Sequence, residues 1–289
     1  MAQPKKTYKE KIASILGFNG RFKDVYASYK LLRKLLDKKS YSLDIPLTSH
    51  CNLKCFGCLH FSPIADSSFA DITTLEKDLK KIEKVTTFFH VVNLIGGEPL
   101  LNPQLDIIFP IIRKTFKKNT IRLITNGVLL NKMPDKFWES ARNNDITIAL
   151  SLYPVLNGQE LEQILIDNGV RYELYGDRSG SWVSFLLDKE KKNTFSHFLN
   201  CKGNQFSWQL IDGKITFCGK ATYSKHLNKR FGTDYHLDRK DVLPLDKGIS
   251  KLKLWRFAFR PKKFCGYCHF PQEDIKWTRS EGKINEWVK

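Results

Sequence analysis

The chain has 289 residues, of which 42% are hydrophobic and 12% are aromatic. This composition supports one substantial hydrophobic core with room for a smaller second unit, and it excludes a chain that is disordered throughout. The 48 Lys and Arg residues outnumber the 30 Asp and Glu residues, and the net charge of +18 favours partners that carry phosphate. No apolar run is long enough to span a bilayer and no signal-peptide pattern is present, so we expect a cytoplasmic protein.

Residues 1–40 form a basic arm that carries eight of the excess positive charges. Between Tyr26 and Lys39, leucines and basic residues follow a helical spacing, which predicts a basic amphipathic helix. We expect this helix to pack on the main domain with its basic face in solvent. The alternative is peripheral contact between this arm and a membrane surface.

Strand-like and helix-like segments alternate between residues 41 and 190. The predicted strands cover residues 41–47, 90–95, 120–125, 146–151 and 170–175, and the predicted helices cover 75–85, 104–117, 135–143 and 159–168, with Thr73 or Thr74 as the first cap. This alternation predicts an α/β fold in which a parallel sheet curves into a partial (β/α)6 TIM-like barrel.

The alternation stops near residue 190. Two strand-like runs, residues 205–211 and 214–218, flank Asp212-Gly213, which is a good signal for a β-hairpin. We expect residues 191–289 to form a small C-terminal module of a hairpin plus helix, together with the C-terminal tail. This module would hold the last four of the seven cysteines.

The first three cysteines stand in the run CNLKCFGC, directly after the first predicted strand. A CxxxCxxC loop can supply three thiolates from Cys51, Cys55 and Cys58 to a four-iron cluster, and it leaves one iron open for a small molecule. The alternative is a structural zinc site, but zinc sites favour paired ligands at C-x2-C spacing, and only His50 or His60 is near enough to be a fourth ligand.

Further polar loops follow the later strands. Gly96-Gly97-Glu98-Pro99 follows the second strand, Asn126 the third, and Ser151 ends the fourth. Because the loops at the carboxyl ends of barrel strands surround one site, we expect these residues to meet the cysteine loop.

Through CNLKCFGC and GGEP, in this order, the chain resembles the radical S-adenosylmethionine (SAM) superfamily over roughly residues 42–190. The resemblance implies a four-iron cluster on the three cysteines, with SAM on the open iron. It also implies that Gly96, Gly97 and Glu98 hold the methionine amine, and that polar residues on later strands, Asn126 and Ser151, lie near the ribose. The family usually has an aromatic residue where this chain has Gly57, which leaves Phe56 or Phe61 to cover the adenine.

The remaining cysteines, Cys201, Cys218, Cys265 and Cys268, are spaced by 17, 47 and 3 residues. Four thiolates can saturate a second cluster. The spacing resembles the auxiliary-cluster module called twitch, a short relative of the SPASM domain, and the whole layout is similar to the deoxy-scyllo-inosamine dehydrogenase family. Zinc is the alternative occupant of this site.

The resemblance implies a radical SAM oxidoreductase whose deoxyadenosyl radical takes hydrogen from a sugar or cyclitol carbon, with the second cluster as electron acceptor. We expect an anionic sugar derivative as substrate and a flavodoxin- or ferredoxin-like protein as electron donor. Alcohol oxidation also needs a base, and the weak candidates near strand ends are Tyr153, Arg171 and Glu173.

Two other functions compete with this one. The first is a SPASM-type maturase that modifies a peptide with the same radical chemistry. The second is a zinc protein that binds nucleic acid, suggested by the basic charge and six Trp residues. Because the chain has no recognised nucleic-acid motif, we expect no nucleic-acid partner.

Overall fold

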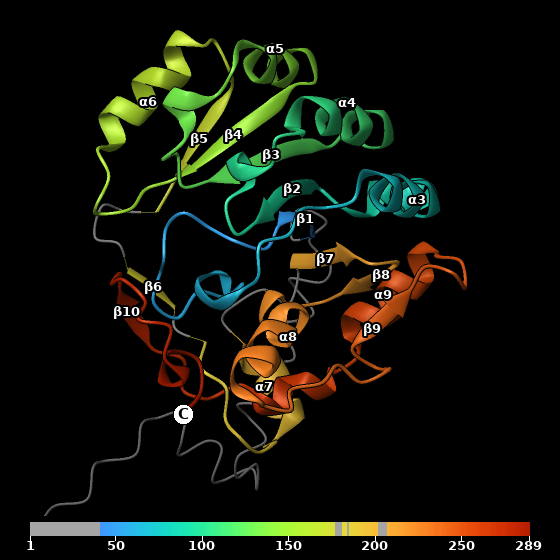
Figure 1. Cartoon of the computed structure of the whole chain (residues 1–289). Helices are drawn as coiled ribbons and strands as arrows, with labels where there is room; N and C mark the ends of the chain where they lie inside the picture. Colours follow the sequence, from blue (N-terminus) through green and yellow to red (C-terminus); the bar gives the residue numbers. More distant parts are fainter. Residues whose placement is uncertain (1–40, 177–180, 184, 202–206) are drawn as a thin grey trace, which may run out of the picture.

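The computed structural model of the chain describes residues 41–176, 181–183, 185–201 and 207–289 (Figure 1). The basic arm at residues 1–40 and its predicted helix therefore lie outside the described residues. No helix in the described part combines the length and the apolar character that a membrane crossing needs.

Every strand and helix predicted between residues 41 and 175 is present. The elements are β1 (Ser42–Thr48), α3 (Ile72–Ile82), β2 (Val91–Gly96), α4 (Leu105–Thr115), β3 (Thr120–Thr125), α5 (Asp135–Asn143), β4 (Ile146–Ser151), α6 (Gly158–Asp167) and β5 (Tyr172–Tyr175). Figure 1 shows α4, α5 and α6 on the outside of the curved sheet.

The C-terminal half mixes short strands with helices. Its elements are β6 (Ser181–Val183), α7 (Thr194–Asn200), β7 (Ser207–Ile211), β8 (Lys214–Thr216), α8 (Gly219–Phe231), β9 (Val242–Pro244), α9 (Lys251–Phe259) and β10 (Asp274–Lys276). Short 3-10 helices are η2 (Ser62–Ile64), η3 (Glu83–Phe88), η4 (Pro99–Leu101), η5 (Leu130–Lys132), η6 (Lys263–Tyr267) and η7 (Ile284–Glu286).

The main sheet has eight strands in the order β5-β4-β3-β2-β1-β7-β8-β9. Neighbouring strands from β5 to β7 pair in parallel, and β8 and β9 continue the sheet antiparallel. This mixed α/β architecture is consistent with the predicted partial barrel. The predicted hairpin forms as β7 and β8, but its first strand pairs with β1, so the hairpin extends the barrel sheet. The domain boundaries at residues 40 and 190 stay a prediction.

The first helix begins earlier than predicted. Asp71, rather than Thr73 or Thr74, caps α3, because the Asp71 carboxylate accepts hydrogen bonds from the backbone N–H (2.8 Å) and the hydroxyl (2.7 Å) of Thr74. A carboxylate at this position satisfies an otherwise unpaired N–H group of the first turn. The helix continues as the 3-10 helix η3, so the whole helical segment runs to Phe88.

A row of polar side chains crosses one face of the parallel sheet. The register pairs Gln209 with Asp44, Asp44 with Asn93, and Asn93 with Arg122. Asp44 is buried and accepts hydrogen bonds from Asn93 (2.8 Å) and Gln209 (2.7 Å), and also from Ser207. Alternate residues on the same strands, such as Leu43 and Leu123, belong to the hydrophobic core. One face of the sheet therefore stabilises the fold and the other offers hydrogen-bonding groups.

Candidate active site

The cysteine loop follows the carboxyl end of β1, as predicted, and N–H donors lie beside two of its three sulfur atoms. The backbone N–H of Leu53 donates to Cys51 Sγ (3.3 Å), and the Asn126 side chain lies 3.6 Å from the same sulfur. The Trp277 indole donates to Cys55 Sγ at 3.2 Å. Such donors stabilise negative charge on sulfur, as thiolate ligands of a metal require.

The thiols of this loop lie close enough to affect one another. Burial, followed by the charges of Glu98 and the other two cysteines, raises the pKa of Cys51 to about 12. Burial, followed by the charge of Cys58, raises the pKa of Cys55 to about 11. Bare thiolates are therefore disfavoured here, and a positively charged metal core would remove that penalty. The chemistry of these donors, three thiols with N–H groups beside them, thus suits an iron–sulfur cluster.

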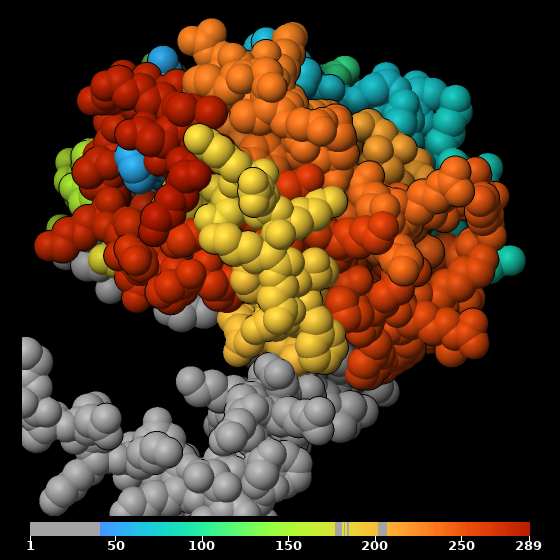
Figure 2. Space-filling view, turned by 90° about the horizontal axis from the view of Figure 1, so that it is seen from below, coloured from blue at the N-terminus to red at the C-terminus, as the bar shows by residue number. Residues whose placement is uncertain are grey.

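The C-terminal segment closes the cysteine loop. The Phe56 N–H donates to Thr278 O (2.9 Å), and the Trp287 indole donates to Cys58 O (3.0 Å). Figure 2 shows this segment, in red, around a small blue area from the beginning of the described chain. Gly57 has φ +63°, and a side chain there would meet Glu286 O at 3.5 Å. The C-terminal segment therefore occupies the space beside the position where the family usually has an aromatic residue.

Of the two aromatic residues proposed to cover the adenine, Phe61 is fully buried. Its ring packs against Trp287, with the ring centroids 5.8 Å apart. Phe61 therefore has no exposed surface for a ligand, whereas Phe56 is half-buried.

The glycine pair lets the end of β2 approach the cysteine loop. The N–H of Gly97 donates to Thr48 O (2.9 Å), and the N–H of Glu98 donates to His50 O (2.9 Å). A Cβ atom on Gly97 would lie 2.0 Å from His50 O, and one on Gly96 would lie 2.2 Å from Thr48 O. Only glycine permits this backbone contact, which positions the start of the cysteine loop.

We expect Gly97→Ala to destabilise the fold by more than about 2 kcal/mol, because the new methyl group forces the backbone at His50 to move. Urea unfolding would measure the loss, and iron content after anaerobic reconstitution should fall with it. Gly158→Ala is the control, because its Cβ would meet only the flexible end of Leu152, at 3.0 Å. Equal iron content in both variants would contradict the prediction.

Glu98 is 1% exposed and joins the loop after β2 to the end of β3. Its carboxylate accepts hydrogen bonds from the Thr125 hydroxyl (2.6 Å) and from the backbone N–H groups of Asn126 (2.9 Å) and Leu100 (3.0 Å). Burial nevertheless raises the pKa of Glu98 to about 7. The side chain predicted to hold the methionine amine therefore also anchors the loop after β3.

This raised pKa makes stability depend on pH. The folded chain holds the Glu98 proton more tightly than the unfolded chain, where the pKa is near 4.5, so this group lowers the free energy of unfolding as pH rises from about 4.5 to about 7. We expect the metal-free wild type to lose about 3 kcal/mol relative to Glu98→Gln between pH 5 and pH 8. Urea titrations of both proteins would measure this difference, and a constant difference would contradict the prediction.

Asn126 and Ser151 lie at the same edge of the sheet as the cysteine loop. The Asn126 side chain donates to Asn52 Oδ1 (2.8 Å) within that loop, and Asn126 is buried. Ser151 is half-buried at the end of β4, where it pairs with Tyr175. The predicted convergence therefore includes the loops after β1, β2 and β3, and the end of β4. The roles of these residues toward SAM stay a prediction.

The three weak catalytic candidates have different surroundings. Tyr153 forms a hydrogen bond with Cys55, and burial raises its pKa well above the usual value. Arg171 precedes β5, at the opposite edge of the sheet from the cysteine loop, and its guanidinium lies 2.7 Å from the Asp145 carboxylate. Glu173 lies within β5 and pairs with Arg122 at 2.9 Å. Only Tyr153 touches the cysteine loop.

Glu173 belongs to a small charged network. Burial raises its pKa, but hydrogen bonds from Tyr175 and Arg122, together with the Arg122 charge, bring the pKa below the usual value. The carboxylate is therefore ionised at neutral pH.

The other four cysteines also converge. Cys201 ends α7, Cys218 precedes α8, and Cys265 and Cys268 lie in and after η6. Burial, followed by the charges of nearby thiols of this same group, raises the pKa of both Cys265 and Cys268 well above the usual value. These residues lie up to 67 positions apart in the sequence. Their role as one ligand set stays a prediction.

Sequence reasoning missed Lys220, a fully buried lysine that directly follows Cys218-Gly219. Burial lowers the pKa of Lys220 to about 8, while the nearby thiols of Cys58, Cys268 and Cys218 raise it. One of these thiols belongs to the first group and two to the second. The sequence signal that could have identified Lys220 was its position two residues after the candidate ligand Cys218.

The side-chain positions in the described residues contain no set of three or more His, Cys, Asp or Glu groups arranged to hold a metal ion.

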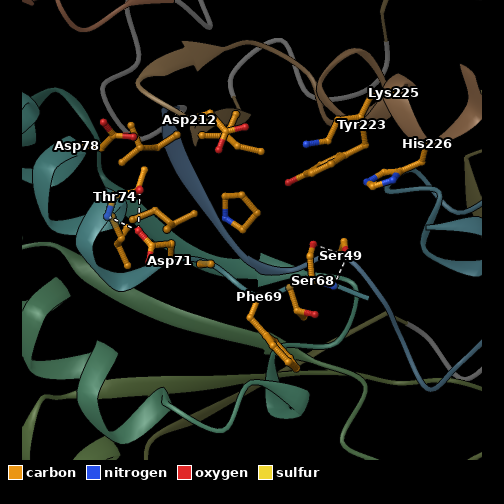
Figure 3. A pocket seen from close by; sticks show the side chains of 17 residues that line it. Ser49, Ser68, Phe69, Asp71, Thr74, Asp78, Asp212, Tyr223, Lys225 and His226 are labelled. Atoms are coloured by element: carbon orange, nitrogen blue, oxygen red, sulfur yellow. Dashed lines mark hydrogen bonds between the residues drawn. The ribbon is translucent and has the colours of Figure 1, made fainter. Parts of the chain in front are cut away.

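A cavity of about 230 Å³ lies beside the carboxyl half of β1 (Figure 3). Asp71, Thr74 and Asp78 from α3 lie on one side of it, and Tyr223 and His226 from α8 lie on the other. None of the seven cysteines lines this cavity. It is therefore separate from both cysteine groups.

Residues 45–153 match the family model described as Radical SAM superfamily. This match covers less than half of the chain and includes the segment that carries the first cysteine group. The match contains the first three cysteines, the glycine pair, Glu98, Asn126 and Ser151.

Several curated relatives are named GTP 3',8-cyclase. The protein of Aliarcobacter butzleri is 27% identical over 187 residues, which are 62% of this chain and 57% of that protein. The protein of Peptoclostridium acidaminophilum is 29% identical over 192 residues, which are 62% of this chain and 58% of that protein. The chain spans about a third to three fifths of the length of the curated relatives it matches.

Two solved structures resemble the chain more distantly. BtrN in complex with AdoMet and 2-DOIA is 13% identical, with a TM-score of 0.43 over 77% of this chain and 83% of that chain. Streptococcus suis SuiB bound to the precursor peptide SuiA is 18% identical, with a TM-score of 0.37 over 57% of this chain and 44% of that chain. Scores this low carry no functional argument.

Proposed function

We propose that this chain, whose residues 45–153 match the radical SAM family model, is a radical SAM oxidoreductase that acts on a hydroxyl-bearing carbon of a sugar or cyclitol. When bound, an iron–sulfur cluster and SAM supply a deoxyadenosyl radical that removes hydrogen from an unreactive carbon. The residues for this task are Cys51, Cys55 and Cys58 for the cluster, and Gly96, Gly97, Glu98, Asn126 and Ser151 for SAM.

One observation carries the proposal. Hydrogen bonds from Asn126 reach both Cys51 and Asn52, and Glu98 holds the Asn126 backbone, so the loops after β1, β2 and β3 form one connected edge. A cofactor bound there meets sulfur donors and polar groups together.

The polar face of the sheet supports a hydroxyl-rich substrate. Asp44, Asn93 and Gln209 lie side by side on it, and Asn93 Oδ1 and Arg122 Nε are buried without a hydrogen-bond partner. Substrate hydroxyls can satisfy such groups. The net positive charge supports an anionic form of the substrate, such as a nucleotide-linked sugar.

Glu173 is the best base among the three candidates. Tyr153 stays protonated at neutral pH, and Arg171 cannot accept a proton. The ionised Glu173 carboxylate can accept the hydroxyl proton as the alcohol becomes a carbonyl. The alcohol would lose its first electron with the hydrogen atom that the deoxyadenosyl radical removes, and its second electron would go to a cluster held by Cys201, Cys218, Cys265 and Cys268. A flavodoxin- or ferredoxin-like protein would supply the separate electron that starts SAM cleavage.

Anaerobic purification followed by metal analysis tests the proposal first. Roughly eight irons per chain support two clusters, and about four support only the SAM site. A protein that contains zinc and no iron would refute the proposed enzymatic function.

The substrate is tested with UDP- and dTDP-sugars that carry deuterium on ring carbons, together with GTP, the nucleotide in the relatives' name. Deuterium in the released deoxyadenosine, with a carbonyl product, supports the proposal. Turnover of GTP alone would contradict it and favour a cyclase.

A further inference from the structure

We propose that the Lys220 ammonium is a shared counter-charge for the two cysteine-ligated metal sites, and that it raises the reduction potentials of the clusters they hold. This inference rests on the proposed function. It concerns a lysine that lies between the two groups of cysteines and belongs to neither.

Without negatively charged groups nearby, the burial of the Lys220 side chain destabilises the fold. The side chain is 1% exposed, and Nζ has no hydrogen-bond partner among the described residues. Lys220 is the second residue of α8, and a positive charge in the first turn opposes the helix dipole. Burying an unpaired ammonium costs several kcal/mol. The contact with the Phe61 ring, 4.7 Å from Nζ to the ring centroid, offsets only part of this cost.

The nearby groups indicate which anions compensate the ammonium. The Phe61 ring that contacts the ammonium belongs to the first cysteine loop, because the Phe61 N–H donates to Cys58 O (3.1 Å), and Cys218 of the second group lies two residues before Lys220. The favourable charge interactions of Lys220 with the thiols of Cys58, Cys268 and Cys218 agree with this position. An iron–sulfur cluster with its thiolates carries net negative charge, which grows by one on reduction. A cation at this position therefore stabilises the reduced state of each cluster.

A second buried lysine provides a contrast. Lys262 is also 1% exposed, but its ammonium donates hydrogen bonds to the carbonyl groups of Phe257 and Arg260. Backbone carbonyl groups therefore accept hydrogen bonds from the Lys262 ammonium. The Lys220 ammonium has no such acceptors in the described part of the chain, and in this proposal the metal sites compensate its charge.

The first experiment uses the full chain with its metals. We expect Lys220→Met to lower the midpoint potentials of the clusters in EPR-monitored redox titrations. The larger shift should occur at the second site, which supplies two of the three thiols. Lys220→Arg keeps the charge and should restore the potentials, and Lys225→Met removes an exposed charge from the same helix as a control. Equal shifts in Lys220→Met and Lys225→Met would overturn the proposal.

The second experiment uses the metal-free chain under anaerobic, reducing conditions. Lys220→Met should raise the urea midpoint of unfolding, because methionine fills the same space without an unpaired charge. Lys262→Met should lower it. A fall in both variants would mean that Lys220 has a packing role, and this would overturn the proposal. Wild-type protein without iron would instead refute the proposed function, while the metal-free comparison would still report on Lys220.

Discussion

Cys55→Ala is expected to abolish the formation of deoxyadenosine from SAM under a strong reductant. Cys55 is the most enclosed sulfur of the first group, because it is buried and contacts both Trp277 and Tyr153. Two thiolates cannot hold the site-differentiated cluster, so no iron is left to bind SAM. The measurement is deoxyadenosine released per chain after anaerobic reconstitution, and we expect a loss of at least about a thousandfold.

Cys268→Ala is the matched control, since it removes the same atoms from the second group. This variant should still cleave SAM. If Cys55→Ala formed deoxyadenosine as fast as the control, Cys55 would not be a cluster ligand. That result would contradict the proposed reaction.

Cys218→Ala is expected to separate SAM cleavage from product formation. Cys218 precedes α8, and its sulfur accepts hydrogen bonds from the backbone N–H groups of Ala221 and Lys220. Losing this ligand should lower iron content from roughly eight to about four per chain and leave the first cluster in place. Deoxyadenosine would then form, but the oxidised product would not, because the second electron has no acceptor.

The readout is the ratio of carbonyl product to deoxyadenosine with the deuterated nucleotide sugars. Thr222→Ala is a suitable control, because it changes the same turn of α8 without removing a sulfur atom. The Thr222 hydroxyl donates a hydrogen bond to Cys218 O (2.7 Å). An unchanged ratio in Cys218→Ala would contradict the electron-acceptor role.

Sequence patterns predicted the barrel half of the chain well because its signals are local. The segments 120–125, 135–143 and 146–151 form with the predicted boundaries, since apolar periodicity and the flanking turn residues fix them. The boundary error at α3 arose because Asp71 is as good a cap as Thr73 or Thr74, and the sequence does not say which oxygen reaches the N–H of Thr74.

What the sequence did not predict depends on distant partners. The pairing of Ser42 with Ser207 joins the hairpin to the barrel, and the indoles of Trp277 and Trp287 reach the cysteine loop across the fold. No local periodicity reports such contacts. The same holds for Lys220, which is buried against the ring of Phe61, a residue far from it in the chain.

The closure of the cysteine loop has a consequence for biosynthesis. The two indoles that reach Cys55 and Cys58 lie 222 and 229 positions downstream of those residues. Cys55 and Cys58 are therefore synthesised long before the two tryptophans that pack on them. Until then their thiols are exposed to oxidants and metal ions. The cover of these two cysteines is complete only after Trp287 has been synthesised, near the end of the 289 residues.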